Sequence, residues 1–244
     1  MNKEKFKESC DSILLSEREK RGIGTLGEKT LHAILKNYFK SDKADQEVKI
    51  GSFVADIVLD EKIIEIQTRA FDRLRNKLEY FLSEYIVTVV YPIPSTKWLI
   101  WINEDTGEMS VRRRSPKQGR IYDIIPELYR IKQLLTHPNL RFCIIFLDME
   151  EYRYLNGWSK DKKRGSTRFD RIPVDLIDEI YINSVSEYTM FLPSELPDIF
   201  TSKDYKNATF ISMRNAQTAL NVLNYLGVVE RVDKKGKLYL YKRT

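Results

Sequence analysis

The segment from Val54 to Thr68, VADIVLDEKIIEIQT, consists of two apolar stretches joined by Asp60-Glu61. Both stretches are rich in β-branched residues, and the charged pair between them is typical of the turn of a β-hairpin. Each predicted strand also carries one carboxylate, Asp56 in the first and Glu65 in the second. The apolar residues require a sheet that is covered on both faces, so two acids in its strands call for a specific explanation.

The spacing of the two acids predicts that they face each other. With a two-residue turn Leu59 pairs with Lys62, which places Asp56 directly opposite Glu65, with Cβ atoms about 4.5–5.5 Å apart. Two carboxylates at this separation repel each other unless one is protonated or a cation lies between them. Carboxylate oxygens, completed by water and phosphate oxygens, are the ligands that Mg²⁺ prefers. The hairpin therefore predicts a site for Mg²⁺, with Mn²⁺ as a substitute; the alternative is that both acids lie at a sheet edge and face solvent.

The surrounding pattern predicts an α/β fold with a mixed sheet. Before Gly22 the chain is highly charged and expected to be helical in part, and a second helix begins at Thr25, with Leu31, Ile34 and Leu35 on its apolar side. The elements predicted after it are strands Gln46–Ile50, Phe53–Leu59 and Lys62–Thr68, a helix Phe71–Ser83, and strands Tyr85–Tyr91 and Lys97–Ile102.

This order of elements, with Asp56 followed by Glu65-Ile66-Gln67, resembles the PD-(D/E)XK nuclease superfamily over residues 22–103. The resemblance implies a restriction-endonuclease-like α-β-β-β-α-β core in which Asp56 and Glu65 bind the metal. It also implies that Gln67 orients the attacking water and that Glu28, on the first helix, assists. An acid near a helix start is alternatively explained by its favourable interaction with the helix dipole.

Two residues depart from the pattern of the superfamily. Ala55 stands where a proline is usual, and Gln67 stands where a lysine is usual. Glutamine can hydrogen-bond a water or a phosphate oxygen, but it supplies no positive charge and accepts no proton at ordinary pH. We therefore expect the missing charge to come from the following helix, with Lys77 and Arg75 as the candidates.

The second half of the chain is predicted to contain a helix Ile121–Leu135, a strand Arg141–Leu147 and a helix Val174–Val185. The prolines of Leu192–Pro197 indicate a linker, which divides the chain into domains 1–191 and 198–244. After the linker, helices beginning at Thr201 and Ser212 precede a hairpin with Lys235-Gly236 at its turn. This small C-terminal domain resembles a winged helix-turn-helix module, although such a module can also serve protein contacts or dimerisation.

Positive charge is concentrated in three segments. The net charge is +5 in residues 112–120, +4 in 157–171 and +4 in 227–244, whereas the whole chain carries only +6. Concentrated Lys and Arg are typical of phosphate-binding surfaces, although three solvated loops would show the same composition. Trp158 could stack on a base or pack at a loop hinge. The residues expected to bind nucleic acid are Arg75, Lys77, Arg112, Arg113, Arg114, Lys117, Arg120, Arg214, Gln217, Thr218, Lys234 and Lys235.

Taken together, these patterns predict a Mg²⁺-dependent DNA endonuclease or a nuclease-like DNA-processing enzyme. The alternative is a catalytically inactive DNA-binding or regulatory protein that keeps the nuclease fold. With 2 Cys and 2 His in the chain, a zinc site is not expected. The charged N-terminus lacks a long apolar run, which predicts a cytoplasmic protein that does not interact with a membrane. The expected partner is DNA. A homodimer is compatible with the sequence.

Overall fold

The computed structural model describes residues 1–21, 30–157 and 167–244, and they form two compact units. The first unit comprises Met1–Val58, Pro92–Arg120 and Ile145–Glu179. The second unit comprises Leu59–Tyr91, Ile121–Ile144 and Ile180–Thr244. The chain passes between the units several times, and its longest strands contribute residues to both.

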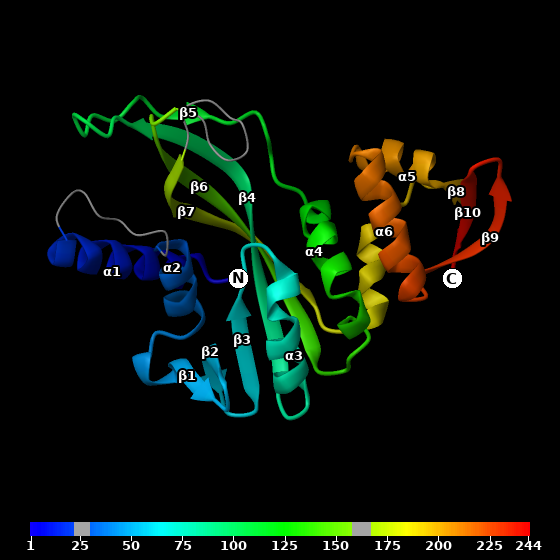
Figure 1. Cartoon of the computed structure of the whole chain (residues 1–244), viewed down its shortest axis with the longest axis horizontal. Helices are drawn as coiled ribbons and strands as arrows, with labels where there is room; N and C mark the ends of the chain where they lie inside the picture. Colours follow the sequence, from blue (N-terminus) through cyan, green and yellow to red (C-terminus); the bar gives the residue numbers. More distant parts are fainter. Residues whose placement is uncertain (22–29, 158–166) are drawn as a thin grey trace. The chain divides into compact units, whose positions relative to one another are not determined.

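Two helices open the first unit, α1 (Lys3–Arg21) and α2 (Thr30–Phe39) (Figure 1). The apolar side predicted for the second helix is confirmed, since Leu31, Ile34 and Leu35 are all buried. Tyr38 meets Phe6 of α1 edge to face, with ring centroids 5.4 Å apart, so aromatic contacts join the two helices. The predicted start at Thr25 lies outside the described residues.

Strands β1 (Gln46–Ile50) and β2 (Phe53–Leu59) have the predicted bounds and pair antiparallel, with Val48 opposite Ala55. Strand β3 (Lys62–Ile66) is shorter than predicted, because the sequence suggested an end at Thr68. The chain leaves the strand after Ile66 and turns through Ala70, whose φ of 59° is left-handed. Gln67 therefore lies in the loop after β3 and not within the strand.

One long strand, β4 (Ile86–Ile102), replaces the two strands predicted for Tyr85–Tyr91 and Lys97–Ile102. The predicted gap between the two strands is wrong, and it contains Pro92 and Pro94. Proline has a φ compatible with extended backbone and removes only one ladder donor. The backbone N–H of Gly119 donates to the Pro94 carbonyl over 2.9 Å, so the neighbouring loop supports the strand there.

Strand β6 (Leu140–Tyr154) is longer than the predicted Arg141–Leu147, and β7 (Thr167–Ile182) was not predicted as a strand. The helix predicted for Val174–Val185 is wrong, because most of this segment belongs to β7. Within the mispredicted part of the strand, Leu176 and Ile182 are buried six residues apart, which is compatible with the two-residue repeat of a strand.

The sheet has the strand order β1-β2-β3-β4-β6-β7, and the short β5 (Arg113–Arg114) pairs with β4. Because β3 runs parallel to β4 while β1 and β2 are antiparallel, the sheet is mixed. The predicted α/β class with a mixed sheet is therefore confirmed.

Two helical segments of the second unit follow β3 and β5. The first begins with a 3₁₀ turn and continues as α3 (Arg75–Leu82), with Leu78 and Phe81 buried as predicted. The second, predicted as one helix over 121–135, is interrupted. It consists of a 3₁₀ turn Ile121–Ile124, helix α4 (Ile125–Arg130) and a 3₁₀ turn Lys132–Leu134.

The C-terminal part of the second unit contains α5 (Ser202–Thr209), α6 (Met213–Tyr225) and a three-stranded antiparallel sheet. Both predicted helix starts are confirmed: the side chains of Thr201 and Ser212 accept hydrogen bonds from the first turns of α5 and α6. The order of this sheet is β8-β10-β9. Its strands are β8 (Ile199–Thr201), which was not predicted, β9 (Val229–Lys235) and β10 (Leu238–Arg243).

Helix α6 packs against α5 and, on another side, against α4 (Figure 1). None of the helices in the described parts of the chain has the length and apolar character needed to cross a membrane.

Candidate nuclease-like site

Asp56 lies in β2, in the first unit. Ala55 and Ile57 beside it are fully buried, and because side chains alternate along a strand, Asp56 points to the other face. Its carboxylate lies 3.1 Å from Nε2 of His32 on α2, and the Asp56 side chain is 18% exposed. His32 was not among the predicted site residues. Its helix was predictable, but a contact between residues so far apart in sequence has no local signal.

Glu65 lies in β3, in the second unit, where its side chain is 3% exposed. Its Oε2 accepts a hydrogen bond from Nζ of Lys77 on α3 at 2.5 Å. A carboxylate buried this deeply requires a paired charge, and the lysine supplies it. The predicted alternative of a solvent-facing acid is therefore excluded for Glu65.

The two cations proposed to replace the missing lysine have different surroundings. Lys77 contacts the Glu65 carboxylate, whereas the guanidinium of Arg75 donates to the backbone carbonyl of Arg130 at 2.5 Å. Of these two residues, Lys77 alone is placed beside the motif by a hydrogen bond in the described structure.

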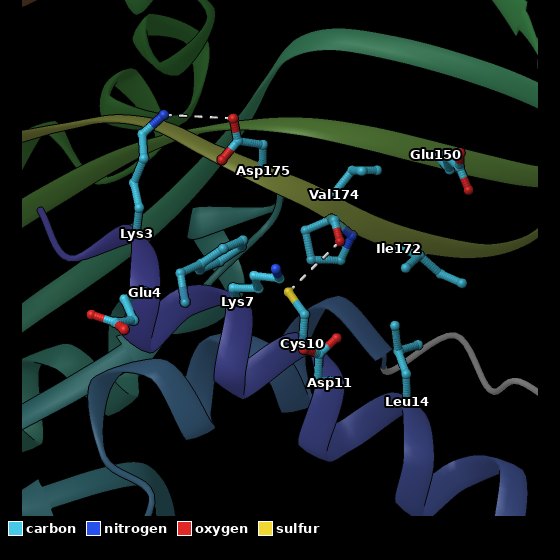
Figure 2. Close-up of a pocket in the computed structure, with 12 residues that line it drawn as sticks. Lys3, Glu4, Lys7, Cys10, Asp11, Leu14, Glu150, Ile172, Val174 and Asp175 are labelled. Atoms are coloured by element: carbon cyan, nitrogen blue, oxygen red, sulfur yellow. Dashed lines mark hydrogen bonds and ion pairs between the residues drawn. The ribbon is translucent and has the colours of Figure 1, made fainter.

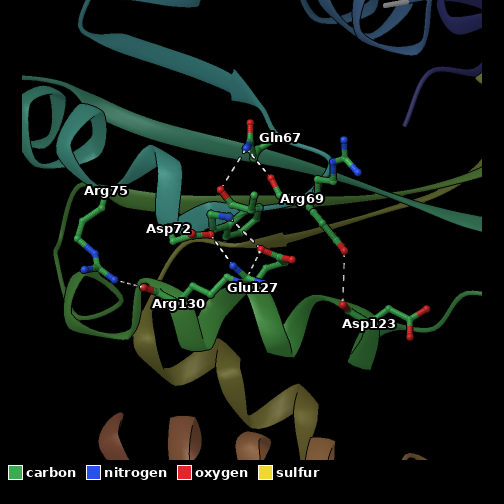
Figure 3. A network of polar contacts seen from close by, with 10 residues as sticks. Gln67, Arg69, Asp72, Arg75, Asp123, Glu127 and Arg130 are labelled. Atoms are coloured by element: carbon green, nitrogen blue, oxygen red, sulfur yellow. Dashed lines mark hydrogen bonds and ion pairs between the residues drawn. The ribbon is translucent and has the colours of Figure 1, made fainter. Parts of the chain in front are cut away.

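Gln67 holds the loop after β3 (Figure 3). Its backbone N–H continues the ladder by donating to Val90 at 2.9 Å. Its amide nitrogen donates to the carbonyls of Arg69 at 2.5 Å and Ala70 at 3.5 Å. The amide therefore fixes the turn that leads to α3.

An ion-pair network fixes the other side of this turn (Figure 3). Glu127 accepts the backbone N–H of Phe71 at 2.9 Å, and Arg130 binds the Asp72 carboxylate at 2.6 Å. The hydrogen bond from Arg130 is the main reason that the pKa of Asp72 lies below its ordinary value. These contacts join α4 to the start of α3, and sequence periodicity did not predict them.

The predicted basic loop of residues 112–120 is exposed at Arg113, Arg114 and Lys117. Arg112 is exposed as well, but it also stacks on Trp98, with its guanidinium carbon 3.9 Å from the ring centroid, and pairs with Glu150 at 3.3 Å. Arg120 is also exposed. The loop therefore presents basic side chains to solvent, while Arg112 also fastens it to the sheet.

The residues predicted on the longer C-terminal helix are not equivalent. Arg214 and Gln217 of α6 are exposed, whereas Thr218 is half-buried and its hydroxyl donates to the Arg214 carbonyl at 2.9 Å. On the hairpin Lys234 and Lys235 are exposed, and the Lys234 ammonium lies 4.8 Å from the centre of the Tyr239 ring.

A separate pocket of about 700 Å³ lies between α1 and β7 in the first unit (Figure 2). Its lining includes the ion pair of Lys3 with Asp175, 3.5 Å long, and Cys10. Burial raises the pKa of the Cys10 thiol to about 12, so this cysteine is a poor nucleophile. None of the predicted site residues lines the pocket.

Glu28 and Trp158 lie outside the described residues. Within residues 1–21, 30–157 and 167–244, no group of three or more His, Cys, Asp or Glu side chains is arranged to hold a metal ion.

Comparison with known proteins assigns the central part of the chain. Residues 29–183 match the family model described as "Domain of unknown function (DUF8091)". The chain belongs to this family. A protein of Treponema pallidum (strain Nichols), named "Uncharacterized protein", is 30% identical over 229 residues, and the similarity covers 91% of this chain and 87% of the relative. No solved structure gives a significant match.

The matched region contains Asp56, Glu65, Gln67 and Lys77, and ends before α5 and α6. The Treponema relative is similar over more than this region, because the similarity covers most of the chain.

Proposed function

We propose that this protein is a metal-dependent DNA endonuclease, or a nuclease-like DNA-processing enzyme, that hydrolyses phosphodiester bonds. The observation that carries the proposal is the buried Glu65 carboxylate with the Lys77 ammonium 2.5 Å away. A strand carboxylate accompanied by a lysine is the combination that the motif requires, and here the lysine comes from α3. The restriction-endonuclease-like core remains part of the proposal.

The chemistry of the acids fits Mg²⁺. Asp56 and Glu65 offer carboxylate oxygens and no sulfur, and the sequence of the hairpin predicts that they form an opposed pair. Such a donor set suits a hard cation that keeps water ligands. When bound, Mg²⁺ would supply a more acidic water and stabilise charge on the phosphate.

The chain's own residues have distinct tasks in this proposal. Asp56 and Glu65 hold the metal, while His32 contacts the Asp56 carboxylate and Lys77 contacts the Glu65 carboxylate. Lys77 can donate a hydrogen bond to a phosphate oxygen, since an ammonium has three donors. Gln67 orients water through its amide oxygen while its amide nitrogen holds the carbonyls of the loop, and Glu28 assists.

We further propose that α5, α6 and the β8-β10-β9 sheet act as a winged helix-turn-helix domain. The exposed side chains of Arg214 and Gln217, with Thr218, would approach the bases, and Lys234 and Lys235 would contact phosphates. The basic loop residues Arg112, Arg113, Arg114, Lys117 and Arg120 would add contacts to the backbone.

The test is nicking of supercoiled plasmid by the full chain with Mg²⁺, Mn²⁺ or EDTA. We expect nicking with either metal, none in EDTA, and at least a hundredfold loss in Asp56→Asn and Glu65→Gln. Asp60→Asn, in the exposed turn of the same hairpin, is the matched control and should retain activity. Circular dichroism would establish that each variant is folded.

A second function, catalytically inactive DNA binding or regulation, is favoured by the absence of lysine at Gln67. In that case the plasmid would bind but remain intact under every metal condition, and Asp56→Asn would bind it as tightly as the wild type. Nicking that persists in EDTA or in both acid variants would contradict the proposed metal site.

A further inference from the structure

A buried carboxylate in the first unit is in contact with three positively charged side chains. Glu151 of β6 has a side chain that is only 3% exposed. It contacts Lys97 of β4 at 3.1 Å and Arg168 of β7 at 3.8 Å. Arg153, two residues along β6, donates from Nε to the same carboxylate at 2.5 Å.

The strand order explains how these cations meet. Strand β6 lies between β4 and β7, so Glu151 receives one cation from each neighbouring strand. Arg153 shares its face because side chains two apart in a strand point the same way. Glu150, the partner of Arg112, points to the opposite face by the same alternation. The three cations therefore lie on the face of β6 opposite to Glu150 and its partner Arg112.

The charges of this cluster do not balance. Burial acts to raise the pKa of Glu151, but the three cations outweigh it, and the pKa lies below its ordinary value. One carboxylate against three cations leaves a net charge of +2. The side chains of Lys97, Arg153 and Arg168 are themselves only 23%, 16% and 32% exposed. Partly burying unbalanced positive charge is costly unless an anion completes it.

Arg168 carries the clearest sign of an incomplete site. Its Nε is buried and has no hydrogen-bond partner among the residues that the structure describes. The distance of 3.8 Å to Glu151 is too long for a hydrogen bond. The Arg168 side chain as a whole is 32% exposed, and a planar guanidinium suits a phosphate group, which accepts two parallel hydrogen bonds from arginine.

We infer that Lys97, Arg153 and Arg168 form a binding site for a backbone phosphate of nucleic acid, with Glu151 holding the three cations in place. The choice of nucleic acid as the source of the phosphate rests on the proposed function, whereas the site itself rests on the cluster. Glu151 is a positioning residue, since it acts through the cations and not on the ligand.

The experiment measures DNA binding without cleavage. Fluorescence anisotropy of a labelled duplex is recorded with the full chain in EDTA, from 50 to 200 mM KCl. Loss of one phosphate contact should reduce the slope of log K against log salt by about 0.9 and weaken binding roughly five- to tenfold near 0.1 M salt. We expect this change in Arg168→Gln, and in Lys97→Gln should the arginine variant fail to fold.

Lys3→Gln is the matched control, because it also removes one positive charge from the first unit. Its ammonium pairs with Asp175, and both side chains are about half exposed. The control should keep the wild-type salt slope. An unchanged slope and affinity in both Arg168→Gln and Lys97→Gln would overturn the inference.

Inorganic pyrophosphate serves as the second probe, by thermal shift. If it stabilises the wild type but not Arg168→Gln, while DNA binding is identical in the two, the site takes free phosphate and the nucleic-acid assignment is wrong. Both the anisotropy and the thermal-shift measurements are made without divalent metal. A protein that does not nick plasmid can therefore still show the expected loss of DNA binding in Arg168→Gln. An active nuclease can equally show no such loss.

Discussion

Nζ of Lys77 lies 2.5 Å from Oε2 of Glu65, and the Glu65 side chain is almost entirely buried. The pair joins α3 to β3 within the second unit, and it supplies a lysine next to a motif that has Gln67 in the usual lysine position. Its first consequence concerns stability, which can be measured whether or not the protein is an enzyme.

Replacing Lys77 by methionine should lower the free energy of unfolding by about 3–5 kcal/mol, because the buried Glu65 carboxylate would lose the ammonium that it contacts. Urea denaturation at pH 7 measures the effect. Arg75→Met is the matched control on the same helix and should cost less than about 1.5 kcal/mol, since it loses one hydrogen bond to an exposed carbonyl. Equal stability of the two variants would contradict the importance of the pair.

Metal binding should be visible as stabilisation. At a Mn²⁺ concentration of ten times the dissociation constant, the folded state gains about 1.4 kcal/mol, which raises the melting temperature by a few degrees. Asp56→Asn should abolish the shift, and Asp60→Asn should retain it. A shift of the same size in Asp56→Asn would show that the metal binds elsewhere.

The buried Asp170 should make stability depend on pH. Burial raises its pKa to about 6 from 3.8, although hydrogen bonds with Thr30 act in the opposite direction. A carboxyl whose pKa is raised in the folded state stabilises the fold fully below the unfolded pKa, and this contribution is lost as pH rises through the folded pKa.

Asp170→Asn should therefore gain roughly 2–3 kcal/mol relative to wild type between pH 4 and pH 7. Chemical denaturation at several pH values measures the difference. Asp175→Asn, whose side chain is 51% exposed, should show no such trend. A wild-type to Asp170→Asn difference that is constant over this range would refute the assignment.

Two side chains on α6 should have separable effects. Gln217 is exposed, so Gln217→Ala should weaken binding to a preferred DNA sequence by about 1–3 kcal/mol if it contacts a base, without loss of stability. Asn221 accepts a hydrogen bond from Lys132 at 3.0 Å. Asn221→Ala should instead cost about 1 kcal/mol of stability. Anisotropy measures DNA binding and urea denaturation measures stability in both variants. If Asn221 is the side chain of α6 that contacts DNA, Asn221→Ala would weaken binding and Gln217→Ala would not.

Gly119 should tolerate no side chain. A Cβ atom there would lie 2.4 Å from both the Pro94 carbonyl oxygen and Cγ2 of Ile93. Gly119→Ala should therefore destabilise the first unit by about 1–3 kcal/mol, through strain between the basic loop and β4. Gly107→Ala is the comparison variant, because an added Cβ atom there would have no neighbouring atom within 4 Å. Its φ of 73° means that alanine would strain the backbone without crowding. Thermal unfolding of both variants separates crowding from backbone strain.

The elements up to α3 were predictable because their signals are local. The strands around Asp60-Glu61 and the apolar side of α2 follow from periodicity, and the starts of α5 and α6 follow from Thr201 and Ser212. By contrast, β4 was predicted as two strands with Pro92 and Pro94 in the gap, and the part of β7 from Val174 to Ile182 was predicted as a helix.

Less of the candidate site was predictable. Sequence spacing identifies Asp56 and Glu65, but their partners His32 and Lys77 depend on how helices pack on strands. The choice between Lys77 and Arg75 is a matter of helical phase, and the two positions differ by two residues. Likewise, no local pattern indicates that Lys97, Arg153 and Arg168 share one carboxylate.

The packing of α6 against α4 has a practical consequence for dissecting this protein. A fragment beginning at residue 198 would contain α5, α6 and the hairpin, but it would lack the helix that covers one side of α6. Lys132, whose ammonium lies 5.0 Å from the Tyr225 ring centre, would be missing too. Binding assays on that fragment would confuse loss of affinity with loss of folding, so a fragment that contains the C-terminal helices should retain residues 121–135.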